Sequence, residues 1–149
     1  MQKIHRLISL LLLLFLILLC SCSKNVKETN KDREKADPET GLIITSLFDE
    51  FTDNLDGANT EKYAADLYDT YLQSDSMNFI HLLSQQKIYR IKPIADLLAS
   101  EAMNISDSSS KRAFATGIRN LLDQKDLTEL EEYTLYELYA RILYYSITL

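Results

Sequence analysis

Apolar and polar positions divide the chain into three stretches. Residues 7–19 form an apolar run that only Ser9 interrupts. Residues 23–37 are almost entirely polar, with Val26 and Ala36 as their only apolar side chains. From residue 38 to 149, apolar residues recur at intervals of three and four, which is the spacing of one helix face. The pattern predicts an all-α fold, a single compact bundle of about five or six helices in residues 38–149.

The first two helices of this bundle are predicted from Asp37 to Gln73. Asp37-Pro38-Glu39 is a favourable helix start, because Asp caps, Pro suits the first turn and Glu complements the helix dipole. We expect this helix to end at Asp56-Gly57 and the next to begin at a capping Asn59. The expected buried side chains are Ile44, Leu47, Phe48, Phe51 and Leu55 in the first helix, and Ala64, Leu67, Tyr68, Tyr71 and Leu72 in the second.

The middle of the chain predicts three further helices. The apolar positions of these helices are Met77, Phe79, Ile80 and Leu83; Ile94, Leu97, Leu98 and Ala102; and Phe114, Gly117, Ile118, Leu121 and Leu122. Residues 87–91 alternate polar and apolar, a weak strand signal. Because this run is short and has no partner strand, we interpret it as a connection or a helix extension. Pro93 is suited to the start of the helix that follows it.

The last helix has the strongest signals. Thr128 with Glu131 has the form of a capping box, and apolar residues then continue almost to Leu149. On a helical wheel the side expected to be buried holds Leu135, Leu138, Tyr139, Ile142 and Leu143. The opposite stripe holds Tyr133, Thr134, Glu137, Arg141, Tyr144 and Thr148. A helix that is apolar nearly all round is typical of the centre of a bundle, whereas Tyr and Arg are enriched at protein interfaces. Both interpretations stay open, and the candidate interface residues are Tyr133, Glu137, Arg141 and Tyr144.

The N-terminal stretch has the pattern of an export signal, with Lys3, His5 and Arg6 before the apolar run and small residues after it. The sequence Leu19-Cys20-Ser21-Cys22 resembles the lipobox of bacterial lipoproteins. That resemblance implies cleavage before Cys22 and a diacylglycerol on its sulfur. It predicts a signal peptide in residues 1–21, a lipidated flexible tether in 22–37 and a place in the bacterial cell envelope, facing away from the cytoplasm. Acylation of Cys20 and an ordinary signal peptide or uncleaved anchor are the alternatives.

The charge of the chain is acidic, with 16 basic and 22 acidic residues and a formal charge of −6. Without Lys3 and Arg6 of the signal region the charge falls to −8. Nucleic-acid binding requires a basic footprint, so we expect no nucleic-acid partner. Both cysteines, Cys20 and Cys22, lie in the signal region, so packing rather than a disulfide must stabilise the domain. Acidity favours solubility and also steers basic partners toward a surface.

Candidate chemistry is sparse after Cys22. His81 is the only histidine there and has no second ligand nearby in sequence, so we expect no metal site. The sequence also contains no phosphate loop, nucleophile elbow or paired-carboxylate signature, so we expect no catalytic residues and no cofactor. The sequence therefore favours a non-enzymatic, membrane-anchored module that binds another protein, of an immunity or exclusion type. The alternative is a structural or accessory lipoprotein of an envelope complex.

Overall fold

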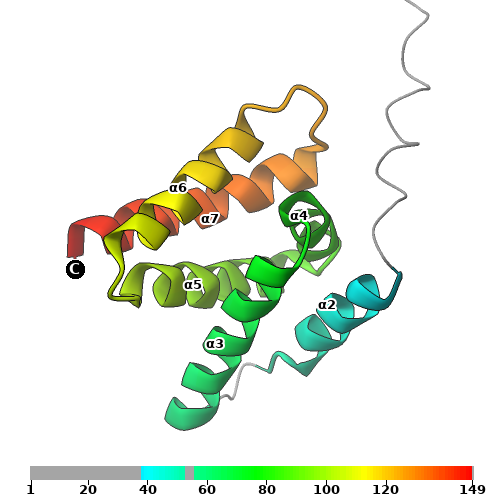
Figure 1. The fold of residues 1–149 in the computed structure, drawn as a ribbon. Helices are drawn as coiled ribbons and strands as arrows, with labels where there is room; N and C mark the ends of the chain where they lie inside the picture. The colour runs from blue at the N-terminus through cyan, green and yellow to red at the C-terminus, as the bar shows by residue number, and fades with distance from the viewer. Residues whose placement is uncertain (1–37, 53–55, 149) are drawn as a thin grey trace, which may run out of the picture. The chain divides into compact units, whose positions relative to one another are not determined.

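A computed structural model describes residues 38–52 and 56–148 of the chain. These residues form six helices and no strand (Figure 1). The helices are α2 (Pro38–Glu50), α3 (Gly57–Gln73), α4 (Ser76–Ser84), α5 (Ile88–Asn104), α6 (Ser108–Leu122) and α7 (Glu129–Thr148). The predicted all-α class is confirmed, while the signal peptide and the tether lie outside the described residues.

Helix α7 is central to the packing. It contacts α5 along much of its length and also packs against α4 and α6, and Figure 1 shows α6 and α7 running side by side. Helix α4 links this group to α2 and α3, and α3 also packs on α5. The fully buried side chains at the centre include Leu67, Ile80, Leu83, Ile94, Leu98, Ile118, Leu135 and Leu138.

A chain of aromatic rings joins helices that are distant in sequence. Phe79 of α4 makes edge-to-face contacts with Phe48 of α2 at 5.2 Å and with Tyr71 of α3 at 5.4 Å between ring centroids. Phe114 of α6 contacts Tyr71 at 5.1 Å and Tyr68 at 5.8 Å in the same manner. This geometry places the electropositive edge of one ring on the electronegative face of the next. The aromatic residues therefore bind α2, α3, α4 and α6 into one core.

Helix α2 ends earlier than the sequence predicts, at Glu50 rather than at Asp56-Gly57. Its terminal carbonyls, and that of Phe51 just beyond its end, accept hydrogen bonds from side chains of other helices. Tyr63 donates to the Leu47 carbonyl at 2.9 Å, and Arg90 donates to the carbonyls of Phe48 at 2.6 Å and Phe51 at 2.8 Å. Arg90 also places a cation at the negative end of the helix dipole, which is favourable. The expected burial of Leu55 lies outside the described residues.

Two further helix starts differ from the prediction. Asp56, not Asn59, is the N-cap of α3, and its carbonyl accepts a hydrogen bond from the backbone of Thr60 at 2.8 Å. Helix α5 begins at Ile88 instead of Pro93, so the 87–91 run is a helix extension. Pro93 lies in its second turn, where a missing N–H costs one backbone bond. Complete burial of Ile91 on the face of Ile94 stabilises this additional turn.

Candidate functional site

The four candidate interface residues of α7 do not share one exposed face. Tyr133, Glu137 and Arg141 are half-buried, and Tyr144 is 62% exposed. Arg141 donates to a carboxylate oxygen of Glu137, one turn away, as the spacing predicts. This pair lies toward α5: Lys92 Nζ is 3.6 Å from Glu137 Oε1, and Arg141 Nε is 3.3 Å from Asp96 Oδ1. Of the four, Tyr144 is the one whose side chain is mainly in solvent.

The pKa of Glu137 reflects its position between α5 and α7, where Arg141 and Lys92 lie close to its carboxylate. Burial raises the pKa of Glu137, but the hydrogen bond and the charge of Arg141 outweigh that effect, with further help from Lys92 and Tyr133. The net result is a pKa below the ordinary value for a glutamate, so the carboxylate is ionised at neutral pH. Glu137 and Arg141 thus act within the α5–α7 contact.

The outer side of α7 carries large exposed apolar side chains, one of which, Leu143, the helical wheel places on the buried side. Tyr136 is 57% exposed, Leu143 47% and Ile147 85%, and Ala140 between them is exposed as well. The expected burial of Leu143 is wrong, because the core side of α7 centres on Leu135, Leu138 and Ile142. Positions 136, 140, 143 and 147 repeat at four, three and four, the period of one helix face. We call these residues, together with Tyr144, the α7 outer stripe.

The α7 outer stripe is uncharged. Between Tyr136 and Thr148 the sequence contains two charged residues, Glu137 and Arg141, and both lie toward α5. The signal for this surface was present in the sequence as a helix that is apolar nearly all round. A helical wheel could not decide which apolar side the neighbouring helices would leave uncovered, since that depends on tertiary packing.

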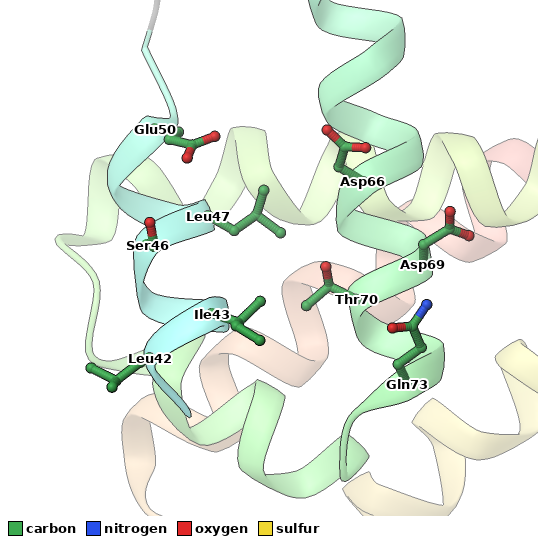
Figure 2. A pocket seen from close by; sticks show the side chains of 9 residues that line it. All are labelled: Leu42, Ile43, Ser46, Leu47, Glu50, Asp66, Asp69, Thr70 and Gln73. Carbon is green, nitrogen blue, oxygen red and sulfur yellow. The ribbon is translucent and has the colours of Figure 1, made fainter. Parts of the chain in front are cut away.

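A second surface feature lies between α2 and α3, where a groove of about 490 Å³ opens to solvent. We call it the α2–α3 groove (Figure 2). Figure 2 shows Ile43 and Leu47 of α2 pointing toward α3, and Thr70 and Asp66 of α3 pointing toward α2. Acidic side chains stand on both walls of this groove. The sequence pattern of either helix alone does not indicate this groove, because both helices are needed to form it.

The histidine is part of a structural network. His81 Nδ1 lies 2.8 Å from Glu131 Oε1, and Glu131 is completely buried. The backbone N–H of Thr128 donates to Glu131 Oε2 at 2.7 Å, and the Glu131 N–H donates to Thr128 Oγ1 at 3.3 Å. The predicted capping box is therefore confirmed, and it also ties α4 to the start of α7. Within residues 38–52 and 56–148, no group of three or more metal-ligating side chains comes together.

Comparison of the chain with family models, with curated proteins and with solved structures yields no match. Among the described helices, none has both the length and the apolar character to cross a membrane.

Proposed function

We propose that this protein is a lipid-anchored, non-enzymatic module of the bacterial cell envelope that binds another protein through the α7 outer stripe. The observation that supports the proposal is the exposure of Tyr136, Leu143, Tyr144 and Ile147 on one helix that is otherwise central to the core. Isolated exposed apolar residues are ordinary, whereas a contiguous exposed patch is typical of an interaction site. The stripe meets this criterion because four large side chains follow one helical face.

The chemistry of the stripe favours a helix of a different protein as its occupant. Apolar side chains at helical spacing pack against an apolar helix face, and a partner gains free energy by removing this surface from water. Tyrosine is enriched among the residues that carry binding energy, because it contributes a large area at a low entropic cost. A second copy of this acidic chain is a poorer occupant, since two domains of like charge repel each other.

The lipobox-like sequence supports anchoring through Cys22. Fifteen residues, 23–37, separate Cys22 from the start of α2. A chain of that length spans on the order of 50 Å when fully extended. Two or three acyl chains would hold the domain at the membrane essentially permanently. In this proposal the domain meets partners that are themselves in or near the membrane.

The immunity or exclusion type and the accessory role both need such a docking surface. The neighbouring genes discriminate between them. A toxin gene next to this one would support the first, and an operon for envelope assembly would support the second.

Photo-crosslinking in the native cell tests the binding proposal. A photoreactive phenylalanine analogue replaces Leu143 in the full-length chain, and a matched variant carries it at the exposed Asn120 of α6. We expect Leu143 to give one adduct with an envelope protein that Asn120 does not give. An adduct only with lipid or with a second copy, or no adduct at Leu143, would contradict the proposal.

A further inference from the structure

The walls of the α2–α3 groove combine apolar and acidic side chains. Ile43 of α2 is 56% exposed, the buried Leu47 follows it one turn later, and both point toward α3, whereas Leu42 at the edge of the groove points away from α3 (Figure 2). The rim carries Glu50 from α2 and Asp69 from α3, both exposed. An apolar base with a rim of charges of one sign is complementary to an amphipathic segment of the opposite sign.

The negative charge of this rim is only partly neutralised within the fold. Asp66, which also lines the groove, pairs with Lys62 one turn earlier on α3. Lys62 also interacts electrostatically with Glu50, and its pKa is raised chiefly by its hydrogen bond to Asp66. Lys62 therefore interacts with two of the three carboxylates that line the groove, and the third, Asp69, lies further along α3. The groove keeps an excess of negative charge.

The walls of the groove are fixed by hydrogen bonds to the end of α2. The buried bond from the Tyr63 hydroxyl to the Leu47 carbonyl joins the two walls directly. Arg90 of α5 holds the carbonyls of Phe48 and Phe51. Because these contacts set the position of α2 before any partner arrives, little conformational entropy is lost at the groove on binding. Such preorganisation raises affinity.

We propose that the α2–α3 groove binds a basic amphipathic helix of another protein. Its apolar side chains would pack on Ile43 and the edge of Leu47, and its lysines or arginines would lie against Glu50 and Asp69 at the rim. This inference goes beyond the function proposed for α7, because the groove shares no residue with the α7 outer stripe. The acidic rim disfavours nucleic acid, anionic lipid and a second copy of this acidic chain as occupants.

The groove is tested with the full-length chain in its native cell. The photoreactive phenylalanine analogue is placed at Ile43 on the α2 wall or at Gln73 on the α3 wall, and Asn120 again serves as the control. Mass spectrometry of the adduct identifies the crosslinked segment. We expect both groove positions to crosslink a segment of another protein in which Lys or Arg alternate with apolar residues at helical spacing.

Charge reversal provides the second arm of the test. Glu50→Lys with Asp69→Lys should lower the crosslink yield from Ile43 at least about tenfold, because like charges would then face each other. The matched control, Asp123→Lys with Glu132→Lys, changes the net charge equally at exposed positions away from the groove, and should leave the yield unchanged. Circular dichroism of both variants serves as the control for folding, and we expect both spectra to remain helical.

The outcomes separate this inference from the proposal for α7. Adducts from Leu143 without adducts from Ile43 or Gln73 would overturn the groove proposal and leave the α7 proposal standing. A crosslink to residues 22–37 of the same chain, to a second copy or to an acidic or uncharged segment would also overturn it. An unchanged crosslink yield from Ile43 in the variant Glu50→Lys with Asp69→Lys would overturn the groove proposal as well.

Discussion

The Tyr63 hydroxyl of α3 donates a 2.9 Å hydrogen bond to the Leu47 carbonyl in the last turn of α2. Both residues are buried. The last carbonyls of a helix have no hydrogen-bond donor inside the helix. Here a tyrosine sixteen residues further along the chain donates to one of these carbonyls. The bond fixes the two walls of the α2–α3 groove relative to each other.

Tyr63→Phe removes this donor and leaves the ring in place. We expect the free energy of unfolding to fall by about 1–3 kcal/mol, because the Leu47 carbonyl then stays buried without that partner. Urea unfolding followed by circular dichroism measures the change. The matched control is Tyr89→Phe, at an exposed tyrosine, which should change stability by less than about 0.5 kcal/mol. Equal stability of the two variants would show that the Tyr63 bond contributes nothing.

The buried tyrosines also make stability depend on alkaline pH. Burial raises the pKa of Tyr63 far above the ordinary value, with Arg90 opposing and Glu50 assisting, and burial raises the pKa of Tyr71 as well. A phenol with a raised pKa in the folded state contributes stability that is fully present below the unfolded pKa of about 10 and is lost as the pH rises beyond it. The unfolded chain releases its protons first, so alkali favours unfolding.

At neutral pH the native chain should have a larger free energy of unfolding than Tyr63→Phe. This difference should become smaller above about pH 10. The phenylalanine variant has no proton to lose at this position, so its stability should decline less steeply. Urea unfolding at a series of pH values from 7 to 11 measures both slopes. Parallel slopes would mean that Tyr63 does not titrate in the way its burial implies.

The start of α7 gives a test of the capping box. Thr128→Ala removes the hydroxyl that accepts the Glu131 N–H and should cost about 1 kcal/mol, the usual effect of losing an N-cap. Glu131→Ala should cost more, because it leaves a buried cavity and takes the carboxylate away from His81. Thermal melts of both variants, with Glu132→Ala as the exposed control, show which substitution causes the larger loss of stability. A smaller loss for Glu131→Ala than for Thr128→Ala would contradict this expectation.

The sequence predicts a structural feature well when the residues that determine the feature are close to one another in the chain. The capping box at Thr128 and Glu131 and the apolar stripes of most helices are of this kind. The end of α2 could not be predicted in the same way, because it depends on Tyr63 and Arg90 from two other helices. The start of α5 differs from the prediction because proline favours a helix boundary, whereas the burial of Ile91 outweighs the backbone bond that Pro93 removes.

The candidate site was less predictable than the fold. Tyr144 lies in solvent, but the charged pair Glu137–Arg141 lies toward α5, where Lys92 and Asp96 form ion pairs with it. The exposed Leu143 and Leu72 were both expected to be buried. A helical wheel finds apolar faces but does not show which of them the rest of the chain covers. The α2–α3 groove requires two helices and could not be found in either one.

Lipid attachment is tested at the cysteines. Cys22→Ser should abolish incorporation of labelled palmitate in the native host, because the resemblance to a lipobox implies acylation of the sulfur of this residue. Cys20→Ser is the control and should keep the label. Retained labelling of the Cys22 variant, with the processed size unchanged, would refute attachment at Cys22. Loss of label only in the Cys20 variant would move the anchor to that residue.

The proposal that the α7 outer stripe binds another protein is tested most directly by partner capture. The measured quantity is the amount of partner that copurifies with the full-length chain when the stripe is changed. Leu143→Ser with Tyr144→Ser alters two exposed side chains, and Leu72→Ser is the matched control on α3. We expect the stripe variant to retain at least about tenfold less of the envelope protein that crosslinks from Leu143. Its melting temperature should be unchanged, and the Leu72 control should retain the normal amount. Normal retention with normal melting would contradict the proposal, as would a large fall in melting temperature, which would make the stripe part of the core.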